Sequence, residues 1–140
     1  MIAARALFIA AIVACGSAHA QGKPCSKADG GNAEKAIDRV STWPQLAKAH
    51  RDWKHCDGNA AVADLYAESL VRLIVEWKNL DAFAGEMKDP EFKAFALEHL
   101  KRPIARDDLD SVYRRAKAEC PANHAEFCAE LAEFAKTASK

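Results

Sequence analysis

The chain has 140 residues with 20 basic and 20 acidic side chains, so its formal net charge is zero. A neutral balance gives no support for binding to nucleic acid or to an anionic membrane, because both require a concentrated positive field. Half of the residues are hydrophobic, whereas Gly and Pro are few, a composition that favours a single helical domain behind a leader.

Residues 1–20 have the layout of a secretory signal peptide. A short basic start, Met1 to Arg5, is followed by an apolar run and then by the small-residue triplet that ends at Ala20. The apolar run is too short and wrongly flanked for a membrane span, and no later run approaches membrane length. We therefore expect cleavage after Ala20 and export to an oxidising compartment, where cysteines pair as disulfides.

Cys15 supports a second interpretation of this leader. The stretch Ile-Val-Ala-Cys that ends at Cys15 is similar to the bacterial lipoprotein cleavage box, in which the cysteine is lipid-modified and becomes N-terminal. We favour simple cleavage, because the lipoprotein interpretation leaves an unusually short leader. A membrane-anchored lipoprotein is the alternative.

The residues directly after the leader, 21–32, predict an irregular N-terminal arm. They contain three glycines and one proline, and Cys25 is their single anchor. A helical domain is then expected over 33–140. Its first helix is predicted over 33–40, with Asn32 as its side-chain cap.

Two stretches carry the clearest helix signals. Thr42 and Gln45 have capping-box spacing, and Pro44 lies in the first turn, where a missing N–H is tolerated. Further along, apolar residues recur at i, i+3, i+4 and i+7 between Val62 and Trp77. This periodicity predicts an amphipathic helix whose wide apolar stripe is covered by other helices.

The C-terminal half predicts further short helices. One is expected over 80–88, Asp89 caps the next, Asp107 or Asp108 caps another, and Asn123 caps the last. No stretch alternates β-branched with polar residues, so no strand is predicted. The expected fold class is therefore all-α, a single compact domain of six or seven short helices.

Four cysteines are left once the leader is removed, and they allow three pairings. Cys120 and Cys128 lie at the end of one predicted helix and the start of the next, so a disulfide there would clamp the corner. By elimination Cys25 would pair with Cys56 and tie the arm to the long helix. A metal site built from all four is the alternative, but structural zinc sites normally use C-x2-4-C pairs, and neither pair has that spacing.

Residues with catalytic or metal-binding chemistry are few. His50, His55 and Asp57 lie close in sequence, but a spacing of five does not place both histidines on one helical face. His99 falls on an apolar face without a marked nucleophile or orienting carboxylate. We therefore expect structural histidines, and we assign no enzyme activity, no metal and no cofactor.

The charged connection between the helices on either side of Pro103 is the candidate partner-binding surface. It carries Lys101, Arg102, Arg106 and Asp107. Loops held by a rigid scaffold often bind partners. A solvated turn is the alternative interpretation.

Four separated pieces of the chain together resemble a known family. They are Trp43-Pro44-Gln45-Leu46, the Cys56-Asp57-Gly58 turn with the Asp64–Ser69 helix, Asp89-Pro90-Glu91-Phe92 with Phe95 and His99, and Cys120-Pro121 with Cys128. The set is similar to small exported all-helical proteins of Gram-negative bacteria akin to the amidase immunity proteins of type VI secretion. In the family pattern an acidic residue and a Glu stand where this chain has Gly58 and Asp64.

This resemblance implies a compact helical domain in the periplasm that binds a protein partner and blocks a peptidoglycan-cleaving amidase. Such proteins are often dimers, so a homodimer is expected as one state. No inhibitory residue is carried over from the family. A non-catalytic envelope protein with a structural or stress-related role is the alternative function.

Overall fold

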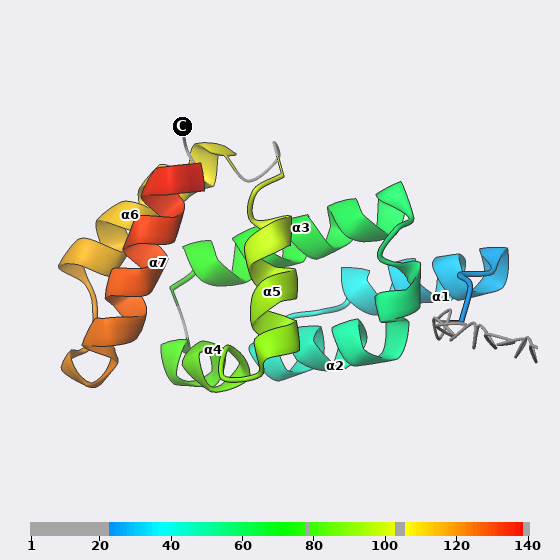
Figure 1. Ribbon diagram of the computed structural model, residues 1–140, viewed down its shortest axis with the longest axis horizontal. Coiled ribbons are helices and arrows are strands. Elements are labelled where there is room, and N and C mark those ends of the chain that lie inside the picture. The colour runs from blue at the N-terminus through cyan, green and yellow to red at the C-terminus, as the bar shows by residue number, and fades with distance from the viewer. Residues whose placement is uncertain (1–22, 78, 103–105, 139–140) are drawn as a thin grey trace, which may run out of the picture.

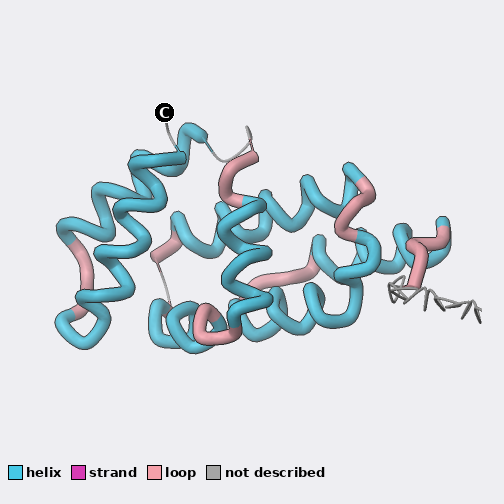
Figure 2. Tube along the Cα trace, in the orientation of Figure 1, coloured by secondary structure: helices cyan, strands magenta, loops and turns pink. Residues whose placement is uncertain are grey.

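The computed structural model describes residues 23–77, 79–102 and 106–138. The predicted leader, with Cys15, lies outside this part of the chain. Seven α-helices and two short 3-10 turns (η) succeed one another in the described residues, and none of these residues forms a strand (Figures 1 and 2). The predicted all-α class is confirmed. The elements are α1 (Lys27–Asp38), α2 (Trp43–Trp53), η1 (Lys54–Cys56), α3 (Ala60–Val75), α4 (Leu80–Glu86), α5 (Pro90–His99), α6 (Arg106–Ala118), η3 (Ala122–His124) and α7 (Ala125–Ala138).

Helix α3 forms the centre of the fold, and α1, α2, α5 and α6 all pack on it (Figure 1). The predicted amphipathic helix is thus confirmed, although it ends at Val75, before Trp77. Burying a large apolar side chain stabilises a fold by about 1.5–3 kcal/mol, so the α3 stripe supplies much of the core. Its most deeply buried members are Val62, Tyr66, Leu70 and Ile74.

Helices α6 and α7 form an antiparallel hairpin at one end of the molecule, away from α1 (Figure 1). Helix α5 crosses α3, and α4 lies between α2 and the hairpin. Trp43 of α2 stacks on Phe83 of α4, with ring centroids 3.8 Å apart. None of the helices in the described residues is long and apolar enough to cross a membrane.

The prediction of an irregular arm over 21–32 is wrong from Lys27 onward, because α1 begins there. The cap is Ser26 rather than Asn32. The Ser26 hydroxyl accepts a hydrogen bond from the Asp29 amide at 3.0 Å, and the Asp29 carboxylate accepts one from the Ser26 amide, which makes a capping box. Gly30 lies buried in this helix, where a Cβ would meet the Asn59 side chain at 3.4 Å. The absence of a side chain at Gly30 therefore allows close packing against Asn59 and does not indicate a loop.

Helix α2 begins as predicted. Thr42 is the N-cap, and its hydroxyl accepts a hydrogen bond from the Gln45 amide at 3.4 Å. The Gln45 side chain reaches back one residue further than a capping box requires and accepts from the Ser41 amide at 2.9 Å. Asp89 caps α5 as predicted, accepting from the Glu91 amide at 2.9 Å.

Two predicted caps in the C-terminal hairpin are wrong. Helix α6 already begins at Arg106, so Asp107 and Asp108 lie within its first turns, where a negative charge is favourable to the helix dipole. Helix α7 begins at Ala125, directly after η3. Asn123 therefore lies in the 3-10 turn, and its side chain donates to Asp81 of α4.

Both predicted disulfides are confirmed. Cys25 pairs with Cys56, with Cα atoms 4.8 Å apart, and joins the segment before α1 to η1. Cys120 pairs with Cys128, with Cα atoms 6.1 Å apart, across the corner between α6 and α7. The alternative of a four-cysteine metal site is thereby excluded, since the sulfur atoms are bonded to each other.

Candidate functional site

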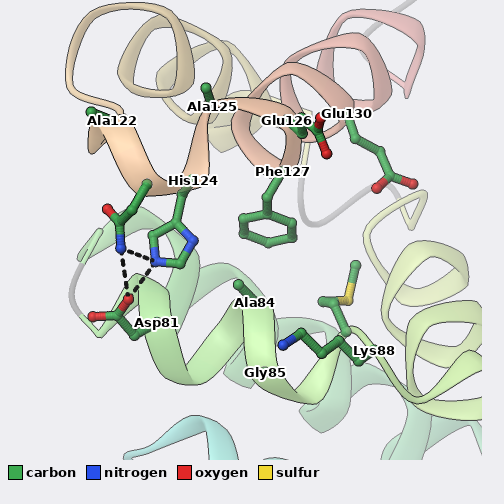
Figure 3. A pocket seen from close by; sticks show the side chains of 12 residues that line it. Asp81, Ala84, Gly85, Lys88, Ala122, His124, Ala125, Glu126, Phe127 and Glu130 are labelled. Atoms are coloured by element: carbon green, nitrogen blue, oxygen red, sulfur yellow. Dashed lines mark hydrogen bonds and ion pairs between the residues drawn. The ribbon is translucent and has the colours of Figure 1, made fainter.

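A cleft of about 830 Å³ opens between α4 and the corner formed by η3 and α7 (Figure 3). Leu80–Glu86 forms one wall, and the first turns of α7 form the other. The cleft brings together segments about 40 residues apart in the chain, since Asp81 of α4 faces His124 of η3.

The α4 wall begins with a turn that positions Asp81. Asn79 precedes the helix and adopts a left-handed backbone with φ of 54°, a conformation in which Asn is several-fold enriched. Asp81 follows in the first turn of α4, where a carboxylate is favourable to the helix dipole. Its side chain is 84 % exposed. The local sequence thus presents a solvated carboxylate at the mouth of the cleft.

The opposite wall is held in place by Cys120–Cys128. Pro121 precedes the 3-10 turn that carries Asn123 and His124, and the disulfide closes the corner on both sides of this turn. The Cys120 sulfur also lies 3.5 Å from the His124 carbonyl oxygen. The disulfide and the hydrogen bond from the His124 amide to the Pro121 carbonyl at 2.9 Å therefore set the position of His124, whose side chain is only 15 % exposed.

Asp81 and His124 face each other at one end of the cleft (Figure 3), and Asn123 is the third polar residue of this group. The His124 ring pairs through Nε2 with Asp81 Oδ1. Asn123 Nδ2 donates to the same oxygen at 3.5 Å. This contact bridges the α6–α7 hairpin to α4, and the second Asp81 oxygen has no hydrogen bond assigned among the described residues.

Apolar contacts brace the same junction. The Phe127 ring extends from α7 toward α4 (Figure 3) and meets Phe83 edge-on, with centroids 5.1 Å apart. Trp77, before α4, donates from Nε1 to the Glu119 carbonyl at 3.3 Å. Met87, which is buried, is among the residues that line the cleft. The two walls are therefore fixed relative to each other on both sides.

The rim of the cleft is acidic. Its lining includes the carboxylates of Asp81, Glu126 and Glu130, against a single lysine, Lys88. Glu130 is paired with Lys93 of α5. Because the floor is apolar and the rim is acidic, the cleft suits a ligand that combines an aliphatic stem with a positive charge.

The residues that line the cleft are not arranged for nucleophilic catalysis. A histidine paired with an aspartate can act as a base, but it needs a nucleophile within hydrogen-bond reach. No Ser, Thr or free thiol is among the described lining residues, and both nearby cysteines are in a disulfide.

His50, His55 and Asp57, which are close in sequence and for which no metal site is predicted, are divided in the structure. Asp57 Oδ1 lies 2.8 Å from Nε2 of His99, on α5. His55 Nε2 lies 3.8 Å from an oxygen of Asp29 instead. His50 takes part in neither pair, so the three residues do not surround one pocket.

His99 is a satisfied buried histidine, as predicted. Its Nδ1 lies 3.0 Å from the Phe95 carbonyl oxygen, one turn earlier on α5, and its Nε2 faces Asp57. The ring also meets Tyr66 edge-on. Burial raises the pKa of the Tyr66 hydroxyl, which donates to the Ala49 carbonyl at 2.9 Å.

The loop predicted to bind a partner is partly engaged within the protein. Arg102 donates to Asp64 of α3 at 2.6 Å, and Lys101 donates to Glu98 at 3.3 Å. The side chains of Arg106 and Asp107 lie outside the described part of the structure. A role of this loop in binding stays a prediction, and neither Lys101 nor Arg102 lines the cleft.

Sequence reasoning did not identify Asp81 or His124, and it assigned Asn123 to a helix cap. Asp81 lies in one segment of the chain and Asn123 with His124 in another, about 40 residues away, so no spacing rule connects them. The one available signal was the Cys120–Cys128 pairing, which predicted a rigid corner around His124 but not what faces it.

Comparisons with protein-family models, with curated proteins and with solved structures find no match to this chain.

Proposed function

We propose that this protein is an exported binding module that holds another protein through the cleft between α4 and α7. The observation that carries this proposal is the cleft itself, with its acidic rim and apolar floor on two braced walls. Preformed sites bind with a lower entropic cost than flexible ones. The two disulfides fit an extracytoplasmic protein, and they add to this rigidity.

The occupant we propose is a partner segment that presents a lysine or arginine side chain. The methylene stem of such a residue would lie along Phe127 and Met87, while its charge would meet Asp81 and Glu126. Asp81 is the best placed of these carboxylates, because it is highly exposed and is oriented by His124 and Asn123. Arginine is favoured over lysine, because its planar guanidinium can bind a carboxylate through two hydrogen bonds.

The partner class suggested by the sequence resemblance is a peptidoglycan amidase in the periplasm. An immunity protein acts by occupying a surface of its enzyme, so it needs a stable complementary face and no reaction of its own. We accordingly propose a binding role without catalysis. The cleft provides such a face, and the α6–α7 hairpin that carries one wall is clamped at its corner.

The test is calorimetric binding of the disulfide-intact mature protein to purified type VI amidases. Tight binding to one of them is expected, and Asp81→Arg is expected to weaken it by about 100-fold, because like charges across an interface cost several kcal/mol. Asp110→Arg is the matched control, since Asp110 is exposed on α6 and outside the cleft.

Two results would overturn this proposal in different ways. If none of the amidases binds, the partner class is wrong. If an amidase binds equally well to the wild type and to Asp81→Arg, the cleft is not the binding surface.

A further inference from the structure

A second feature of the molecule lies away from the cleft, where the ring of Phe95 contacts two histidine rings. His50 of α2 stacks on Phe95 with centroids 4.0 Å apart and planes 24° apart. His99 lies at 4.5 Å on the same helix as Phe95. Tyr66 of α3 meets Phe95 edge-on at 4.8 Å. All four rings are buried, so they form the contact between α2, α3 and α5.

The two histidines differ in their hydrogen bonding. Nδ1 of His99 is hydrogen-bonded to the Phe95 carbonyl, and its Nε2 lies 2.8 Å from Asp57 Oδ1 in an ion-pair contact. His50 is only 6 % exposed. Neither of its ring nitrogens touches solvent or has a hydrogen-bond partner among the described residues. The cage therefore favours the uncharged form of His50, since a buried charge without a partner is costly.

The charged groups around His50 do not supply such a partner. Asp57 is in contact with His99. On α5, Glu91 accepts a hydrogen bond from Lys54 of η1 at 2.7 Å. Two carboxylates thus lie in the neighbourhood, but each is already paired. Burial is the largest influence on His50 and lowers the pKa of its ring below the ordinary value, whereas Glu91 and Asp57 act in the opposite direction.

We propose that His50 is an acid-sensitive latch that holds α5 against α2. At neutral pH the uncharged ring stacks on Phe95 and closes the contact. When the pH falls and the ring takes up a proton, the imidazolium leaves the aromatic cage to reach water, and α5 separates from α2. The step is a reversible proton uptake, and it needs no other reactant.

Separation of α5 from α2 would also affect the cleft, because α5 is linked to its rim. Helix α5 follows α4 after the turn at Lys88 and Asp89, and its Lys93 pairs with Glu130 on the rim of the cleft. Separation of α5 therefore frees a cleft carboxylate. The latch itself stands on the His50 cage alone and does not depend on the proposed binding partner.

Hydrogen exchange of the oxidised mature protein, followed by mass spectrometry at about pH 7.5 and about pH 5 and corrected for intrinsic rates, tests the latch. Protection of peptides from α2 and α5 is expected to fall by about tenfold or more at the lower pH. Protection of α6 and α7 should change far less. The opening should reverse when the pH is restored.

His50→Phe keeps a stacked ring but removes the proton site, so its α5 protection is expected to be the same at both pH values. His50→Met serves as a second variant should the larger ring disturb the core. His55→Gln is the matched control, because it removes a neighbouring histidine and should leave the acid response intact.

The proposal is overturned if the wild type keeps its α5 protection at about pH 5, a pH at which an ordinary histidine is charged. It is also overturned if a folded His50 variant opens as the wild type does.

Discussion

Asp57 Oδ1 lies 2.8 Å from Nε2 of His99 and joins the turn before α3 to the last residue of α5. The histidine is buried, whereas the aspartate is partly exposed. The carboxylate is thus the only acidic group that meets His99 directly among the described residues, and it compensates a ring that is otherwise enclosed by Phe95 and Tyr66.

Removing this carboxylate is expected to destabilise the protein. Asp57→Ala leaves Nε2 of the buried His99 ring without its partner, whereas Nδ1 keeps the Phe95 carbonyl, and an unpaired buried polar group costs about 1–3 kcal/mol. Urea denaturation of Asp57→Ala, His99→Gln and the double variant would give the coupling energy, expected to be about 1 kcal/mol or more. Additive effects of the two substitutions would contradict the pairing.

Asp64→Ala provides the control for that measurement. Asp64 pairs with Arg102, but both side chains are substantially exposed. Exposed ion pairs contribute only about 0–1 kcal/mol, so its effect should be clearly smaller than that of Asp57→Ala.

The free energy of unfolding is expected to fall as the pH is lowered from 7 to 5. Burial lowers the pKa of His50 in the folded state, so the unfolded chain takes up a proton near pH 6.5 that the native chain does not bind. The part of the free energy of unfolding that depends on uncharged His50 is therefore present above about pH 6.5 and is lost as the pH falls below it. Urea denaturation at several pH values in this range should show the free energy of unfolding falling with pH in the wild type and falling less steeply in His50→Phe.

The carboxylates affect the stability of the protein over a separate, more acidic pH range. Hydrogen bonds from Ser26 and Lys23 lower the pKa of Asp29 to about 2. The pairing with Lys54 lowers the pKa of Glu91. The stabilisation of the folded state by these two ionised carboxylates is fully present above their ordinary pKa values. It is lost as the pH falls through the lowered pKa values of the folded protein. An identical slope between pH 7 and 5 in His50→Phe would therefore contradict the assignment to His50.

The two disulfides are expected to contribute unequally to stability. The sequence separations are 31 residues for Cys25–Cys56 and 8 for Cys120–Cys128. Chain-entropy estimates give about 3.7 and about 2.5 kcal/mol for loops of these lengths. Paired Cys→Ala variants compared by urea denaturation should show this order, and the reverse order would contradict it.

The corrected start of α1 can be tested with two single substitutions. Ser26→Ala removes the N-cap and should cost about 1 kcal/mol. Asn32→Ala lies within the helix and is expected to change stability by less than about 0.5 kcal/mol. Thermal or urea denaturation would compare them, and an equal effect at both positions would favour the later helix start.

Local signals explain what the sequence predicted well. The caps at Thr42 and Asp89 were identified, because a cap is a contact between residues two or three positions apart. The α3 stripe was identified because a helix repeats every 3.6 residues. Both cysteine pairings were also correct, because few pairings were available.

The errors have a different physical origin. Gly30 and Gly31 predict a loop by their composition, but Gly30 is helical and packs against Asn59 and Cys25. The helical conformation of Gly30 goes with the close packing of α1 on the residues around Asn59, which cannot be inferred from neighbouring residues in the sequence. Asn123 was assigned as a cap because Asn often serves that role, whereas its side chain faces Asp81 across the cleft.

The sequence by itself determined the helical class, the main helix starts and the two covalent links, since these depend on neighbouring residues or on a small set of cysteines. Only the tertiary structure decided which side chains meet. Asp57 with His99, Asp81 with His124, and the cage around His50 each join residues from separate helices or turns. Packing of the apolar stripes sets these distances, and periodicity along one helix carries no information about the angle at which another helix crosses it.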